Sequence, residues 1–136
     1  MPRRCDGVAF GFVSTVRNLD TAFDSFEATW EPRIVQQMNN YDVRIAKCEG
    51  LHTWHSHGDT DEFFMVVAGE FTIHLRDVNP VVLAPGDTYV VAKGVEHCPE
   101  AAPGTKILMC EPQGTPSTGD EGDVAHLTTT SGITIT

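Results

Sequence analysis

From Tyr41 to Pro112 the chain is divided into short apolar runs by turn-forming residues. Glycine, proline or aspartate interrupts the pattern after roughly eight to twelve residues, a spacing typical of strands joined by tight turns. The expected strand runs are 41–48, 62–77 with a turn at Gly69-Glu70, 80–98 with a turn at Pro85-Gly86-Asp87, and 105–112. The spacing predicts an all-β antiparallel barrel or sandwich and argues against βαβ units.

The segment before this region has a different period. Residues 20–30, DTAFDSFEATW, place Phe23, Phe26 and Trp30 at helical spacing, with Asp20 or Thr21 as the expected N-cap. Pro32 marks either the end of this helix or the first turn of a second one that would carry an apolar face on to Met38. We therefore predict a short helical segment packed on the barrel.

The chain of 136 residues fits one domain with one core. We predict an N-terminal extension at 1–40, a β-barrel at 41–113 and a polar C-terminal arm at 114–136, rich in Thr, Ser and Gly. The arm is expected to be irregular and to pack on the barrel or on a partner subunit. His126 lies in it and indicates nothing by itself.

The acidic composition argues against nucleic acids and anionic membranes as partners. The formal net charge is −10, from 19 acidic against 9 basic residues, and this balance repels nucleic-acid phosphates and anionic membrane surfaces. No apolar run is long enough for a transmembrane helix, which needs about 18 residues or more. The N-terminus is not read as a signal peptide, and four scattered cysteines without a CxxC pair favour thiols in a reducing compartment. We expect a cytoplasmic protein.

The stretch GLHTWHSHGDTDE, residues 50–62, holds three of the six histidines. If it is a strand, His55 and His57 point to one face together with Thr53, while His52 and Trp54 point to the other. Trp54 then needs cover, which the N-terminal helix or a partner subunit could supply. Asp59 and Asp61 are expected to be solvated turn acids or to hold a histidine N–H.

Glu62 begins the next expected strand after the turn-forming Gly58-Asp59-Thr60, so its carboxylate can return beside the histidines. Phe64 shares its parity and is the candidate substrate contact. His97 ends a later strand-turn-strand unit and can enter the same barrel interior. Three imidazoles and one carboxylate suit a first-row divalent metal. An octahedral ion would keep two open positions, whereas tetrahedral zinc would be closed and structural.

These residues resemble the two motifs of the cupins. The first motif corresponds to Gly50, His55, His57, Glu62 and Gly69, and the second to Gly86, Gly94 and His97. The sequence departs from the family pattern at three points: four residues separate Gly50 from His55, Ala92 replaces a proline, and Ala101 replaces an asparagine. None of these departures removes a candidate ligand.

The resemblance, to small single-domain bacterial cupins and the mannose-6-phosphate-isomerase-like cupins, implies a double-stranded β-helix, or jelly roll. It implies one divalent ion (Fe, Mn, Ni or Zn, with iron favoured) held by His55, His57, Glu62 and His97. It also implies a small-molecule substrate or ligand and a homodimer. The favoured function is an iron(II) dioxygenase or oxidoreductase. The alternatives are a metal-dependent isomerase or lyase with a sugar-type substrate, and a cupin that binds a small ligand without catalysis.

Overall fold

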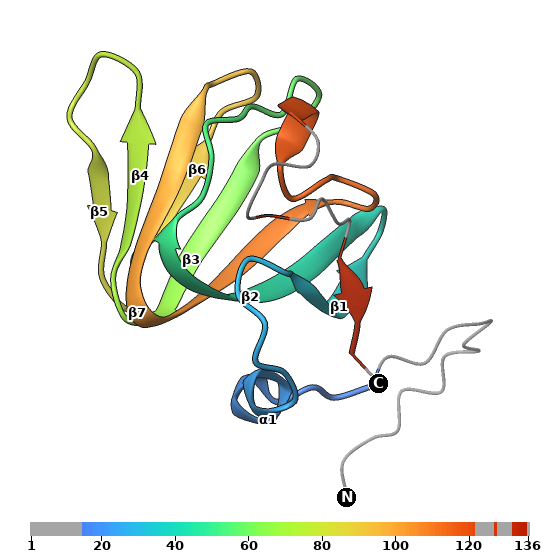
Figure 1. Cartoon of the computed structure of the whole chain (residues 1–136). Helices are drawn as coiled ribbons and strands as arrows, with labels where there is room; N and C mark the ends of the chain where they lie inside the picture. Colours follow the sequence, from blue (N-terminus) through green and yellow to red (C-terminus); the bar gives the residue numbers. More distant parts are fainter. Residues whose placement is uncertain (1–14, 122–126, 128–131, 136) are drawn as a thin grey trace, which may run out of the picture.

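The computed structural model describes residues 15–121, 127 and 132–135, and within them it is an all-β fold with one short α-helix (Figure 1). The helical elements are α1 (Leu19–Asp24) and a 3-10 turn, η1 (Gly119–Glu121). The strands are β1 (Arg33–Met38), β2 (Tyr41–Leu51), β3 (Glu62–Ala68), β4 (Phe71–Leu75), β5 (Val81–Leu83), β6 (Thr88–Val91), β7 (His97–Pro112) and β8 (Ile133–Thr134). The predicted double-stranded β-helix with a short helix is confirmed.

The long strand β7 organises the sheet. Its first residues pair antiparallel with β4, its last residues pair with β3, and most of its length pairs with β2. The strand order is β5-β4-β7-β2-β1-β8, with β3 bonded to β7 and β6. Figure 1 shows β7 bending at the base of the molecule as it passes from the β4 side to the β3 side. The two sides enclose the core without closing into a complete barrel.

Strand alternation decides which side chains face this core. Along β3, Glu62, Phe64 and Val66 are buried and their neighbours are partly exposed, as period-two alternation predicts. The residues of the main apolar cluster come from β2, β3, β4, β6 and β7 and from β5 at the edge: Ala46, Cys48, Phe64, Val66, Phe71, Ile73, Leu83, Val91, Ala101, Ile107 and Met109. Glu62 therefore projects from a strand whose other inward side chains are apolar.

The turn between β3 and β4 needs glycine for two reasons. Gly69 has φ 85°, a left-handed conformation that costs other residues energy, and a Cβ there would collide with Thr105. The Thr105 hydroxyl accepts from the Glu70 backbone N–H, and the Glu70 and Ala102 carbonyls lie within its donating distance. This first-motif glycine thus fixes the register between β3 and β7.

The N-terminal helix is shorter than predicted. It ends at Asp24, and Asn18 is the N-cap, accepting from the Thr21 N–H at 3.2 Å, so the predicted caps Asp20 and Thr21 were wrong. Of the two alternatives at Pro32, a second helix reaching Met38 was wrong, because residues 33–38 form β1 against β2. The apolar residues of such a short window fit either period, and backbone pairing with β2 decides for a strand.

The segment before β1 nevertheless packs on the sheet. Phe23 and Phe26 are buried in a second apolar cluster with Val35 and Ile45. The N-terminal helix or a partner subunit was expected to cover Trp54; in this chain the Arg76 guanidinium lies over it, 3.8 Å from the indole centroid. In the C-terminal arm β8 pairs parallel with β1, and Thr115 and Thr118 are buried. Cys5 and His126 lie outside the described residues.

Across the part of the chain that the structure describes, no helix is long and apolar enough to cross a membrane.

Candidate metal centre

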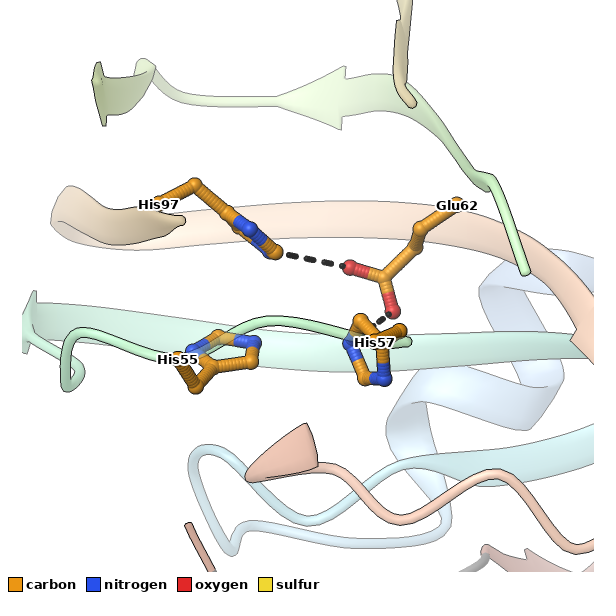
Figure 2. A group of neighbouring side chains, drawn as sticks. All are labelled: His55, His57, Glu62 and His97. Atoms are coloured by element: carbon orange, nitrogen blue, oxygen red, sulfur yellow. Dashed lines mark ion pairs between the residues drawn. The ribbon is translucent and has the colours of Figure 1, made fainter. Parts of the chain in front are cut away.

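Four side chains from three segments meet inside the open end of the fold (Figure 2). His55 and His57 lie in the loop between β2 and β3, Glu62 opens β3, and His97 opens β7. One donor atom from each residue lies within 4.8 Å of the donors of the other three, and all four side chains are buried. These are the four residues that the sequence pattern predicted as ligands.

Backbone hydrogen bonds hold the histidine loop in place. His55 and His97 exchange both backbone hydrogen bonds, each at 2.9 Å, so these two candidate ligands are directly opposite one another. The Gly94 N–H donates to the His57 carbonyl at 2.8 Å. On the other side the Asp120 N–H donates to the Ser56 carbonyl at 3.1 Å. The loop is therefore fixed by both the second motif and the C-terminal arm.

The prediction of a regular strand at the histidines was wrong in one respect. Residues 52–57 carry a single bridge, at His55, and their side chains do not alternate. His52 is buried rather than directed away, with its ring centroid 5.0 Å from that of His55 and 4.8 Å from that of Trp30. His55 and His57 still converge, because the loop turns inward at both positions.

Hydrogen bonds assign the tautomers of two histidines. Nδ1 of His55 lies 2.8 Å from the Thr53 carbonyl oxygen, and Nδ1 of His97 lies 2.9 Å from that of Val95. Since a carbonyl only accepts, each Nδ1 carries the proton and each Nε2 keeps a lone pair. This arrangement is the usual one for an imidazole whose Nε2 binds a metal.

The buried donor atoms around Glu62 fit an ion better than they fit one another. Glu62 Oε2 lies 3.1 Å from His57 Nε2, and Oε1 lies 3.5 Å from His97 Nε2 (dashed in Figure 2). Yet neither Nε2 has a hydrogen-bond partner of good geometry among the described residues. Buried polar atoms without such a partner are rare in proteins. Here they point to a group that the protein alone does not supply.

The spacing also suits one ion. Two donors on the same ion at about 2.1 Å can be at most about 4.2 Å apart, so the cluster needs to contract by roughly half an ångström. Nitrogen and oxygen donors of this kind bind first-row divalent metals. The residues present therefore fit a divalent metal ion.

Burial and neighbouring charges shift the pKa values of His55 and Glu62. Burial, assisted by the neighbouring His97, lowers the pKa of His55 to about 3. For Glu62, burial alone would raise the pKa, but contacts with His57, His97 and Glu111 outweigh it and hold the pKa well below its usual range. A neutral His55 and an ionised Glu62 are the states that ligate metals.

Glu111, at the end of β7, was missed by the sequence analysis. Burial and the negative charge of Glu62 raise its pKa well above the usual range, so it keeps a proton beside Glu62. Its Oε1 accepts from Nη1 of Arg44 at 2.8 Å, and both side chains are buried. The signal was available: Glu111 has the inward parity of Ile107 and Met109.

The structure also places the predicted substrate contact, Phe64, and the two predicted turn acids, Asp59 and Asp61. Phe64 is buried and lines a cavity together with His55 and Glu62. The Asp61 carboxylate accepts from the Lys93 N–H at 2.8 Å, which ties the loop to the second motif, and Asp59 is exposed.

Known proteins resemble this chain in sequence and in fold. The uncharacterized protein YdbB of Bacillus subtilis is 36% identical over 63 residues, which span 46% of this chain and 56% of YdbB, so the match covers little more than half of that relative. A cupin-2 domain protein of Shewanella frigidimarina superposes with a TM-score of 0.69 at 42% identity, covering 71% of this chain and 94% of the other. A hydroquinone 1,2-dioxygenase of Sphingomonas sp. TTNP3 has a TM-score of 0.58 at 18% identity, covering 73% and 80%, which shows a common fold alone.

The family model described as the cupin domain matches residues 42–110, half of the chain. The matched range runs from the start of β2 almost to the end of β7 and includes all four converging side chains. This chain belongs to the cupin family.

Proposed function

We propose that this chain is a metal-dependent enzyme for a small-molecule substrate, with an iron(II) dioxygenase as the favoured reaction class. His55, His57, Glu62 and His97 would hold the ion. One observation carries the proposal: three buried imidazoles and one ionised carboxylate converge, and two Nε2 atoms lack well-formed hydrogen bonds among the described residues. An apolar cavity opens on the same cluster.

The ligand set supports chemistry at the metal rather than a closed structural site. Four protein donors leave two positions of an octahedral ion for other groups. When bound, iron(II) supplies the redox chemistry needed for reaction of dioxygen with an organic substrate. The protein's part is to keep His55 and His97 in the Nδ1–H tautomer and Glu62 ionised, and to exclude bulk water from the buried cluster.

The first experiment measures metal content by elemental mass spectrometry on untagged protein. We expect about one ion per chain in the wild type and a loss of most of it in His57→Ala and His97→Ala. The matched control is His74→Ala, since His74 lies on β4, contacts Glu100 at 3.4 Å and is partly exposed away from the cluster. Full occupancy in His57→Ala would contradict the ligand assignment.

The second experiment separates the reaction classes. Oxygen uptake by iron-loaded protein, absent in zinc-loaded protein, would support the dioxygenase. Turnover without oxygen, supported by zinc, nickel or manganese, would replace it with an isomerase or lyase. Saturable ligand binding with no turnover under any of these metals would leave a binding module. The homodimer and the cytoplasmic location stay predictions; sedimentation velocity of the purified protein tests the dimer.

A further inference from the structure

The cavity beside the candidate ligands is mainly apolar. Its free volume is about 30 Å³, so a ring-sized ligand enters only when side chains at its mouth move apart. His55 and Glu62 form its inner end, and Ser117 of the C-terminal arm reaches its wall. The apolar lining comes from the inward faces of β2, β3, β4 and β7 and from the segment before β1: Trp30, Pro32, Ala46, Phe64, Phe71, Pro99, Ile107 and Met109.

No lysine or arginine is among the residues that line the cavity in the described part of the chain. The buried Arg44 on β2 does not line the cavity, and its guanidinium is hydrogen-bonded to other groups. It donates to Asp42 Oδ2 at 2.9 Å, Glu111 Oε1 at 2.8 Å and the Thr115 carbonyl at 2.7 Å. A phosphate or a second carboxylate placed against this lining would lose its hydration without gaining a charged partner, which is costly.

Trp30 forms one side of the cavity in an unusual conformation. Its φ is 57°, a left-handed value that is uncommon for a bulky residue and that often marks functional sites. Two hydrogen bonds to β2 hold it there: its backbone N–H donates to the Lys47 carbonyl at 2.8 Å, and its indole Nε1–H donates to the Glu49 carbonyl at 2.9 Å. Because the indole N–H is used, the ring offers the cavity an apolar surface.

Aromatic rings continue this wall inward. The Trp30 ring centroid lies 6.5 Å from that of Phe71, and the Phe71 centroid lies 5.3 Å from that of Phe64. Phe64 and Glu62 are on the same face of β3, so the aromatic wall leads directly to the candidate ligands. Rings at these separations contact one another and together present a continuous apolar surface.

We infer that the substrate is a small, uncharged, mostly apolar molecule with oxygen donors for the metal at one end. Its apolar body packs against Trp30, Phe71 and Phe64, and its donor end meets the ion beside His55 and Glu62. This inference rests on the proposed function. It excludes phosphorylated and polyhydroxylated sugars as the substrate class, and it makes Trp30 a specificity-determining residue.

The test uses zinc-loaded full-length protein, in which no oxygen chemistry interferes, and isothermal calorimetry. Catechol is the neutral aromatic probe with two adjacent oxygens, and glucose 6-phosphate is the polar anionic probe. We expect catechol to bind at least tenfold more tightly. Equal or tighter binding of glucose 6-phosphate to protein with one zinc per chain would overturn the substrate class and leave the metal proposal intact.

Trp30→Gly removes the ring and places at φ 57° the residue that best tolerates it. We expect at least a tenfold loss of catechol affinity with unchanged zinc content. Trp54→Phe changes the other tryptophan of the chain, which lies under Arg76, and should leave affinity unchanged. Unchanged catechol binding in folded Trp30→Gly protein would overturn the role of Trp30. If Trp30→Gly does not fold, Trp30→Gln provides the same comparison.

A further experiment tests the cavity without the metal. In Trp54→Phe protein Trp30 is the remaining tryptophan, and nitrobenzene, a neutral aromatic that quenches indole fluorescence on contact, reports occupancy of the cavity. Saturable quenching of metal-free protein, not relieved by glucose 6-phosphate, would support the apolar cavity even if no metal bound. Linear quenching equal to that of free tryptophan would contradict it. A protein that does not bind metal and a protein that does not bind an apolar ligand thus give different results.

Discussion

Arg44 is a fully buried guanidinium behind the candidate metal ligands. It connects Asp42 and Glu111 on neighbouring strands, and Glu111 in turn faces Glu62. Removing one member of such a buried ionic group leaves the others uncompensated in a medium of low dielectric constant. The residues that support Glu62 are therefore also expected to support the fold.

Arg44→Met should lower the free energy of unfolding by about 3–5 kcal/mol, because Asp42 would be left buried without its cation and Glu111 without its hydrogen-bond donor. Urea unfolding followed by circular dichroism measures this change. Arg76→Met is the matched control: Arg76 pairs with Glu96 at the exposed surface, and its loss should move the midpoint far less. Similar midpoints for the two variants would show that the buried network adds little stability.

Glu111 should affect metal affinity through its contact with Glu62. Glu111→Gln keeps an oxygen for Arg44 and an N–H donor toward Glu62, so affinity should stay close to the wild-type value. Glu111→Leu loses both groups, and residues that orient metal ligands typically contribute about 10–100-fold in affinity. Competition with a chromophoric chelator measures the two dissociation constants, and equal values would remove Glu111 from the support of the site.

At the scale of elements, the histidine loop depends on the C-terminal arm. Gly119 in η1 approaches the loop so closely that a Cβ there would collide with the Ser56 carbonyl and lie 3.0 Å from Cδ2 of His55. Its φ of 59° is also left-handed. The arm thus acts as one wall of the candidate metal site, a contact that its Thr- and Ser-rich composition did not indicate.

Gly119→Ala should weaken metal binding, since the new methyl group displaces the loop that carries His55 and His57. Gly114→Ala is the matched control: Gly114 also has a left-handed φ, of 85°, but a Cβ there meets nothing within 4 Å. Chelator competition should show a larger loss of affinity for Gly119→Ala than for Gly114→Ala. Equal losses would assign the effect to backbone conformation alone.

The elements differ in how far the sequence predicts them. Strands β3 and β4 and residues 105–112 of β7 follow from turn residues and alternation, and the same parity places Glu62 with Phe64. The secondary structure of residues 33–38 is ambiguous from sequence, because their short apolar pattern suits a helix as well as a strand. Only the pairing with β2 shows that they form a strand. The burial of His52 could not be predicted from parity, because parity applies to strands and residues 52–54 form none.

The four ligand types and their order could be predicted because two motifs fix them, whereas their support could not. Arg44 reads in sequence as one charged residue in an alternating strand, and only the pairing of β2 with β7 brings it to Glu111. The same holds for Gly119, whose contact with Ser56 depends on how the arm folds back. Local pattern therefore predicts the ligands, and long-range pairing decides what holds them.

At the scale of the whole molecule, an ion that binds the folded chain and not the unfolded chain stabilises the fold. The gain is about 2.7 kcal/mol when free metal is 100 times the dissociation constant. The candidate ligands come from the β2–β3 loop, β3 and β7, so binding ties together segments that the unfolded chain does not hold near one another.

Removal of the ion with a chelator should therefore lower the melting temperature by roughly 5–10 °C for a chain of this size. Differential scanning calorimetry before and after dialysis measures the shift, and readdition of metal should restore it. The His57→Ala protein should show no shift under the same treatment. A wild-type melting temperature that is independent of metal would contradict a bound ion linked to folding.

The long strand β7 has a further consequence during synthesis. A growing chain that has emerged as far as Glu96 already contains His55, His57 and Glu62, but it lacks the strand that pairs with β2, β3 and β4 and that begins with His97. Non-local pairing of this kind forms late, because the cost of closing long loops comes before the contacts that offset it. We therefore expect metal loading to wait until β7 has emerged and paired, so that the ions present at that moment decide which metal the protein carries.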